Sequence, residues 1–182
     1  MDNGLIPQRY AKALYKYALE KGNTESLYNI MKVVINSFES NPDLQKVLSN
    51  PFVNDDDKEK LLLSAAGKDA GDAYTRFVKL ILDHGRADYS YLMMLAYRDL
   101  YRKENNISRV KISTASSLSP TLMERLHSLV RDSFKGSVLE FSEVVDPDLI
   151  GGFVIDVDSV RMDASLSNEL EQIRQTLLRS NS

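Results

Sequence analysis

Apolar residues in the first 105 positions recur every three or four places, which is the spacing of one face of an α-helix. After Asn106 the pattern changes, and stretches that alternate apolar with polar residues, as strands do, are mixed with helical ones. This change predicts an N-terminal helical domain over residues 1–106 and a smaller domain over residues 107–182. The predicted fold class is α+β: an N-terminal six-helix bundle followed by a small α/β domain with a short sheet and two helices.

The expected helices are separated by residues that stop or start a helix. Gly22 and Gly85 each follow an apolar helical stretch and suit the left-handed backbone that ends a helix. Pro42 suits a first helical turn, and the three aspartates at 55–57 suit the positive end of a helix dipole. The expected helices run over about 7–21 and 24–40, then a short one after Pro42, one starting near residue 55, and two over about 69–84 and 88–105.

The first and the fifth of these helices carry more apolar surface than one core-facing stripe requires. The first also places the small residues Ala11, Ala13 and Ala18 among large ones. Such a surface can form a groove that admits another helix. The pattern alone favours a second interpretation, in which these are two central helices of a bundle, buried on both sides.

Three strands and two helices are expected after residue 106. The strands cover 107–113, 138–145 and a third stretch after Gly151-Gly152, where residues 153, 155 and 157 share an apolar face and Asp156 and Asp158 share the other. Ser119 is expected to cap the first helix of this region. Ser165 is expected to cap the last, whose apolar positions 166, 170, 173 and 177 form a narrow seam for packing along another helix.

Composition removes most chemical functions. The 182 residues include no Cys and two His, which excludes disulfides, thiolate zinc sites and a cysteine nucleophile. The motifs of phosphate-binding loops, dinucleotide folds, serine hydrolases and zinc proteases do not occur, so the sequence predicts no enzyme, no cofactor and no metal. No apolar run is long enough to span a membrane and no signal peptide precedes the first helix, which favours a cytoplasmic protein.

The remaining polar candidates have simpler interpretations. The aspartates at 55–57 lack the spacing of a calcium loop and are expected to start a helix. Asp156 and Asp158 are expected to form a solvated face. His84, beside a glycine, is expected to cap a helix end. His127 adjoins the buried face of its helix, and the sequence identifies no partner for it.

The net charge of −3 argues against a general binder of nucleic-acid backbones. Residues 1–105 carry 15 basic and 15 acidic side chains, whereas residues 106–182 carry 8 basic and 11 acidic ones, so the excess lies in the second region. The strand–helix–strand–strand–helix order there still permits an alternative, an RNA-binding protein with a helical domain plus an α/β RNA-binding domain. Against that alternative, no strand combines basic with aromatic residues that could stack bases.

Several short segments, in their order and spacing, resemble the delta subunit of F-type ATP synthases, whose mitochondrial counterpart is the oligomycin-sensitivity-conferring protein. The resemblance covers nearly the whole chain, and together the segments are fairly specific. They are Arg9 to Ala18 (RYAKALYKYA), Gly85-Arg86, Thr114 to Ser119 (TASSLS), Asp148 to Phe153 (DLIGGF) and Asp163 to Leu166 (DASL).

The resemblance implies a non-catalytic stator subunit that supports proton-driven ATP synthesis. In that family the helical domain receives the N-terminal segment of an α subunit of the catalytic head in a groove between its first and fifth helices. The second domain meets the b subunits of the peripheral stalk. One copy per complex is expected at the cytoplasmic face of the inner (plasma) membrane, held peripherally, with no direct membrane insertion and no nucleic acid. The residues that the resemblance assigns to the groove are Tyr10, Ala11, Ala13, Leu14, Ala18, Phe77, Val78, Ile81 and Leu82.

Overall fold

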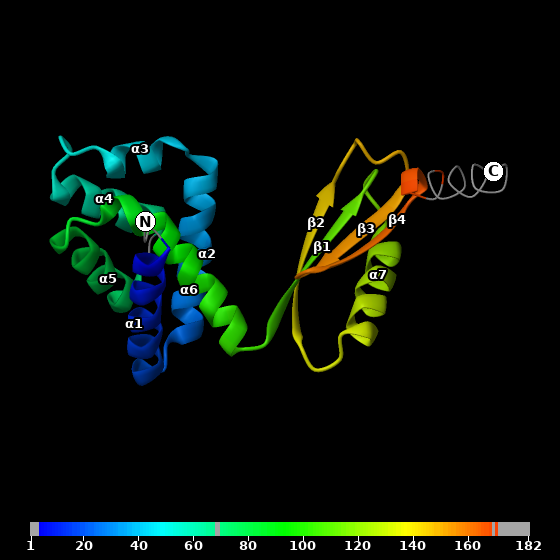
Figure 1. Ribbon diagram of the computed structural model, residues 1–182, viewed down its shortest axis with the longest axis horizontal. Coiled ribbons are helices and arrows are strands. Elements are labelled where there is room, and N and C mark those ends of the chain that lie inside the picture. The colour runs from blue at the N-terminus through cyan, green and yellow to red at the C-terminus, as the bar shows by residue number, and fades with distance from the viewer. Residues whose placement is uncertain (1–3, 68–69, 169, 171–182) are drawn as a thin grey trace, which may run out of the picture. The chain divides into compact units, whose positions relative to one another are not determined.

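The computed structural model describes residues 4–67, 70–168 and 170. It divides into two compact units, Met1–Glu104 and Asn105–Ser182, which are called here the helical unit and the α/β unit (Figure 1). The α+β class predicted from the sequence is confirmed. Within the described ranges, no helix combines the length and the apolar character needed to cross a membrane.

The helical unit is built from helices joined by short turns. Gly22 ends the first helix with a φ of 66°, and its N–H donates to the carbonyls of Ala18 and Leu19. The elements are α1 (Leu5–Lys21), α2 (Thr24–Ser40), α3 (Asp43–Ser49), α4 (Asp55–Ala65), α5 (Gly71–Asp83), the 3₁₀ turn η1 (Ala87–Tyr89) and α6 (Ser90–Glu104).

The polar residues around α4 and α5 act as helix ends, as the sequence predicts. Asn54 accepts a hydrogen bond from the Asp57 N–H at 2.8 Å, so the run of aspartates occupies the first turn of α4. His84 forms the cap of α5, with Nδ1 2.7 Å from the Leu80 carbonyl oxygen, and Gly85 follows with a φ of 61°.

Buried tyrosines join the helices of this unit. Tyr74 on α5 donates its hydroxyl to the Leu62 carbonyl of α4 at 3.0 Å, and burial raises the pKa of the Tyr74 phenol. Tyr97 on α6 lies 3.3 Å from the Thr24 carbonyl at the start of α2. Because both rings are fully buried and both hydroxyls find acceptors, they hold neighbouring helices without an unsatisfied polar group.

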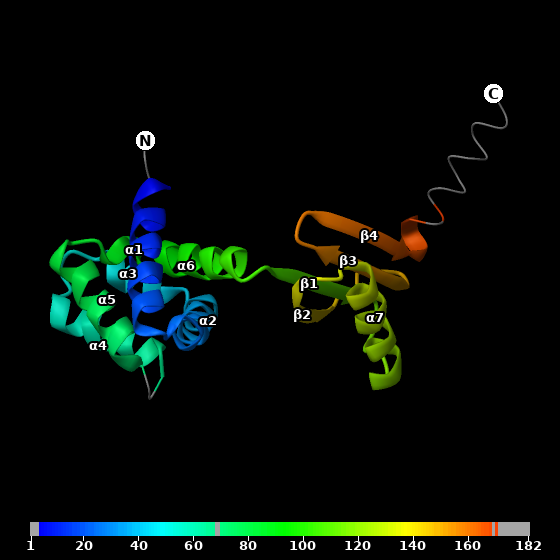
Figure 2. The same cartoon turned by 90° about the horizontal axis from the view of Figure 1, so that it is seen from below.

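The α/β unit is a four-stranded sheet with one helix packed on a face, as Figure 2 shows. The strand order is β2-β1-β3-β4, with β1 and β2 parallel and the other two pairs antiparallel. The elements are β1 (Ile107–Thr114), α7 (Pro120–Ser133), β2 (Val138–Val145), β3 (Gly152–Val157) and β4 (Val160–Ser165).

A thin core lies between the sheet and α7. Ser119 caps α7 by accepting the Leu122 N–H, as predicted. The register sets the apolar residues of β1 opposite those of β3, so that both strands turn the same face toward α7. The buried members of this cluster are Val110, Ile112, Val130, Ile155 and Val157.

Two features of this unit differ from the sequence prediction. The strand β4 was not predicted, although Val160, Met162 and Ala164 alternate along it. The prediction that Asp158 shares a strand face with Asp156 is wrong, because β3 ends at Val157 and Asp158 takes a turn conformation with a φ of 48°.

The segment after β4 agrees with the predicted cap. Ser165 Oγ accepts the Asn168 N–H at 3.3 Å, and residues 166–168 are helical. The predicted seam continues to residues 173 and 177, which lie outside the described residues.

Candidate functional site

The helices α1 and α5 lie side by side and antiparallel, in agreement between Figures 1 and 2. The rings of Tyr10 and His84 meet edge-on with their centroids 6.3 Å apart. Further along, the pKa of Arg76 is raised mainly by a hydrogen bond to Asp72, with a smaller electrostatic contribution from Tyr17 of α1. Two stripes therefore face each other, residues 10, 13 and 17 of α1 and residues 84, 80 and 76 of α5.

The predicted groove residues divide into a supporting layer and an accessible layer. Tyr10 is half-buried and Ala13 is exposed, so these two can touch a docked segment. Leu80, which was not predicted, faces the same stripe and is 43% exposed. Its helical spacing from Arg76 and His84 is the signal that could have identified it. The other seven predicted residues are buried in this chain, namely Ala11, Leu14, Ala18, Phe77, Val78, Ile81 and Leu82.

A second hollow lies on the other side of α1. It has a volume of about 510 Å³ between α1 and α6. Pro7 and Ala11 line it from α1, and Leu92 and Ala96 line it from α6. Leu92 is 44% exposed and lines this hollow, so it corresponds in exposure to Leu80 on the opposite side of α1. The structure therefore offers two apolar surfaces on α1, one toward α5 and one toward α6.

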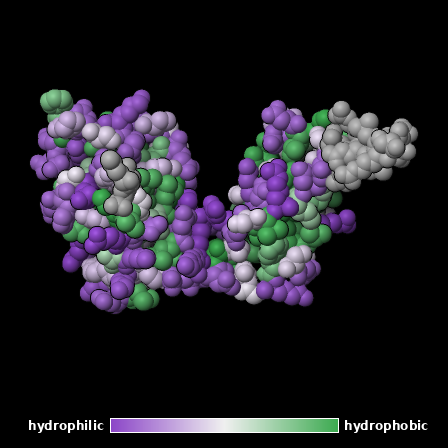
Figure 3. All heavy atoms as spheres, in the orientation of Figure 1, coloured by the Kyte–Doolittle hydropathy of each residue, from purple (hydrophilic) through white to green (hydrophobic). Residues whose placement is uncertain are grey.

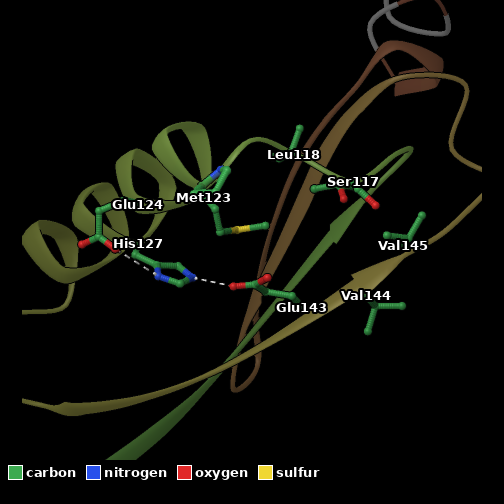
Figure 4. A pocket seen from close by; sticks show the side chains of 10 residues that line it. Ser117, Leu118, Met123, Glu124, His127, Glu143, Val144 and Val145 are labelled. Atoms are coloured by element: carbon green, nitrogen blue, oxygen red, sulfur yellow. Dashed lines mark ion pairs between the residues drawn. The ribbon is translucent and has the colours of Figure 1, made fainter.

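The α/β unit has a cleft between α7 and β2, called here the α7–β2 cleft and shown in Figure 4. Its volume is about 510 Å³, and Leu118, Met123 and Val145 supply apolar lining. His127 of α7 points across it toward Glu143 of β2.

His127 has the partners that the sequence does not identify. Its Nε2 lies 3.3 Å from Glu143 Oε1, its Nδ1 lies 3.8 Å from Glu124 Oε2, and its ring packs on Phe141 at 4.1 Å between centroids. Although close to Glu143, the buried Nε2 makes no hydrogen bond of good geometry in the described part of the chain. These contacts join α7 to β2. His127 Nε2 is the polar atom that remains without a hydrogen bond in the described part of the cleft.

Apolar atoms also cover much of the visible face of the α/β unit in Figure 3. Large apolar side chains with at least 40% of their surface exposed come from every element of this unit except β1 and β3. They are Leu122, Leu129, Val138, Val144, Val145, Ile150, Val160, Met162, Leu166 and Leu170. Exposed apolar surface of this extent is typical of a protein that binds other proteins.

The fold and these surfaces define a class, a two-unit α+β protein with exposed apolar surfaces. The same fold occurs in a chain of the mitochondrial ATP synthase hexamer of Toxoplasma gondii, with a TM-score of 0.71 and 17% sequence identity, covering 94% of this chain and 97% of that one.

Sequence comparison then identifies the family. The family model described as ATP synthase delta (OSCP) subunit matches residues 6–177, so the chain belongs to this family. The ATP synthase subunit delta of Parabacteroides distasonis is 39% identical over 178 residues, covering 98% of each chain. The subunit of the same name from Phocaeicola vulgatus is 37% identical over 179 residues, covering 98% of this chain and 96% of the relative. These relatives leave the RNA-binding alternative unsupported.

Proposed function

We propose that this chain is the non-catalytic stator subunit of an F-type ATP synthase, which holds the catalytic head to the peripheral stalk and so supports proton-driven ATP synthesis. The family match over residues 6–177 carries this proposal. The chain acts peripherally, at the cytoplasmic face of the membrane that contains the complex. Residues 1–106 form the head-binding domain, a six-helix bundle, and residues 107–182 form the domain that meets the b subunits.

The function is tested by proton pumping in membranes that lack this chain. Membrane vesicles from cells deleted for its gene are mixed with the purified full chain and supplied with ATP. Pumping should return, because a head that is held still can drive the rotor, whereas ATP hydrolysis by the detached head should be the same with and without the chain. Heat-denatured chain is the control. Unrestored pumping, or hydrolysis that depends on the chain, would contradict the proposal.

The α-subunit segment is proposed to dock on the face between α1 and α5. A helix lying there meets Ala13, whose small side chain admits a close approach, with Tyr10 at one end and Leu80 opposite. The buried layer beneath, which includes Leu14 and Ile81, fixes the spacing of the two helices. Stator contacts must dissociate slowly, and nanomolar affinity corresponds to about −12 kcal/mol. Three or four large apolar side chains can supply much of that free energy.

Two matched variants distinguish this face from the hollow beside α6. Leu80→Glu and Leu92→Glu place the same charge at positions of nearly equal exposure, 43% and 44%, on opposite sides of α1. Titration calorimetry uses a synthetic peptide copying the N-terminal segment of the organism's own α subunit. Leu80→Glu and Ala13→Glu should each weaken binding at least tenfold, and Leu92→Glu should not.

Each other outcome of this titration has a definite meaning. If only Leu92→Glu weakens binding, the segment docks between α1 and α6 and the assignment to α5 is wrong. If titration of the wild-type chain with the peptide gives no heat of binding, helix docking on this unit is excluded.

A further inference from the structure

The strand β2 is an outer strand of the sheet. In the described part of the chain it pairs with β1 on one side only, over eight residues from Val138 to Val145. Edge strands are usually short, or carry lysine, proline or a bulge, because their outward N–H and C=O groups can pair with another chain. The sequence of β2, VLEFSEVV, contains neither lysine nor proline, and its charged residues are two glutamates, Glu140 and Glu143. The other outer strand, β4, is shorter and runs directly into helical residues.

The side chains beside this edge show what kind of segment would fit. Phe141, Glu143 and Val145 alternate along β2 and so share the face that borders the α7–β2 cleft. The carboxylate of Glu143 is therefore flanked by two apolar residues, and it is 51% exposed. A strand laid along β2 would place alternate side chains opposite this apolar–acidic–apolar series.

The charges that line the cleft favour the binding of a cationic side chain. Glu143 and Glu124 both face His127, whose Nε2 is buried without a hydrogen bond in the described chain. Arg131, which lies outside the lining of the cleft, is 2.9 Å from Glu124 and packs over Phe141, so its charge is committed to Glu124. Figure 4 shows the Glu143 carboxylate pointing across the cleft toward His127, and because the Glu143 side chain is still 51% exposed, a docked cation can reach it.

We propose that the β2 edge and the α7–β2 cleft together bind an extended protein segment that contains a lysine or arginine flanked by apolar residues two positions away on either side. Backbone hydrogen bonds to β2 hold the segment as a fifth strand. Its cation pairs with Glu143, and an apolar side chain packs on Leu118, Met123 and Val145. This surface lies in the α/β unit, and the inference does not depend on the proposed docking of the α-subunit segment.

The test uses the full chain, labelled with nitrogen-15, and the acetylated, amidated peptide Thr-Val-Thr-Lys-Thr-Val-Thr. Its valines and lysine fall on one face of a strand, as the series on β2 requires. The amide signals of residues 138–145 and of His127 should shift with increasing peptide. A peptide N-methylated at each valine and at the threonine that follows it, which cannot pair along the edge in either strand direction, should bind at least about tenfold more weakly. Glu143→Gln should weaken the lysine peptide about threefold and remove its advantage over the peptide with glutamate at the central position.

Two controls keep the proposal falsifiable. Glu39→Gln removes an exposed carboxylate from α2 and should leave the affinity unchanged. Shifts confined to other surfaces, equal binding of the N-methylated peptide, or no binding at all would overturn the proposal. Sedimentation of the free chain supplies a further check. If the chain forms a dimer that shields the amides of β2, the occupant of the edge is a second copy and the proposed segment is wrong.

Discussion

The helical unit and the α/β unit bury their apolar residues in different ways. In the helical unit, large side chains from several helices are fully buried together, including Leu27, Met31, Tyr74, Met93 and Tyr97. In the α/β unit, a cluster of five buried aliphatic residues lies between the sheet and α7, while many leucines and valines remain at the surface. The helical unit thus encloses a larger buried core, although it also exposes apolar residues such as Leu80 and Leu92, whereas the α/β unit leaves a larger share of its apolar residues for contact with a partner.

The largest effect expected from this difference is on the free energy of unfolding when a buried side chain of the core is shortened. Ile81 in α5 and Ile112 in β1 are both fully buried, so Ile→Ala removes the same atoms in each unit. Ile81→Ala should cost about 4 kcal/mol, because the surrounding helices cannot close the cavity, and Ile112→Ala about 2 kcal/mol, because the one-sided core can relax.

The distribution of tyrosines along the chain provides a spectroscopic probe that separates these two isoleucine variants. All nine tyrosines lie before residue 105 and the chain has no tryptophan, so tyrosine fluorescence reports the helical unit alone. In urea unfolding, Ile81→Ala should shift the fluorescence transition, and Ile112→Ala should shift only a transition seen by circular dichroism. A single transition that moves equally with both variants would show that the two units do not unfold separately.

Backbone strain gives the next largest contrast. Gly152, at the start of β3, has a φ of 79°, and a Cβ there would meet the Ala164 carbonyl oxygen of β4. Gly22 at the end of α1 has a φ of 66°, but a Cβ there would meet open space. Gly152→Ala should therefore cost more than about 2 kcal/mol, from strain and the forced separation of two strands, and Gly22→Ala about 1 kcal/mol.

Thermal unfolding measured by the same two signals separates these glycine variants. Gly152→Ala should disorder the α/β unit while the tyrosine signal of the helical unit keeps its midpoint. Equal costs for Gly152→Ala and Gly22→Ala would mean that the close approach of β3 and β4 is not maintained in solution.

The same contrast explains which parts of the fold the sequence could predict. The bounds of α2 were predicted correctly because its limits are local, set by Gly22-Asn23 before it and Asn41-Pro42 after it. The strand β4 was missed because it lies at an edge, where Val160 and Met162 stay 59% and 42% exposed and give a weak apolar signal. Its turn also lacks a glycine, since Asp158 adopts the positive φ.

The candidate surfaces were less predictable because they depend on contacts distant in sequence. Periodicity places Ala11 and Ala13 on the same helix, but only the packing of neighbouring helices, α6 among them, buries Ala11 and leaves Ala13 exposed. The side chain of His127 meets Glu143, which arrives on a neighbouring strand. One sequence taken by itself contains no local signal for either contact.

The smallest effect concerns one short-range side-chain hydrogen bond in each unit. Asp163 Oδ1 accepts the Ser165 N–H at 3.0 Å, and Asn50 Oδ1 accepts the Phe52 N–H at 2.9 Å with the same two-residue spacing. Only the first acceptor can titrate. Hydrogen bonds from the Ser165 hydroxyl and backbone N–H lower the pKa of Asp163 below its ordinary value of 3.8. Because the folded pKa is lowered, the stabilisation is complete above that ordinary value and is lost as the pH falls through the lowered pKa.

The two hydrogen bonds are tested by following the chemical shifts of the Ser165 and Phe52 amides. The pH is lowered from 6 through the range in which carboxyl groups titrate. The Ser165 amide should move with a midpoint below 3.8, and the Phe52 amide should stay nearly constant because its acceptor is neutral. Asp163→Asn should make the Ser165 amide equally insensitive while keeping an acceptor in place. A midpoint at or above 3.8 would mean that the carboxylate is not held by Ser165. In that case the hydrogen bonds between Asp163 and Ser165 would not stabilise the end of β4.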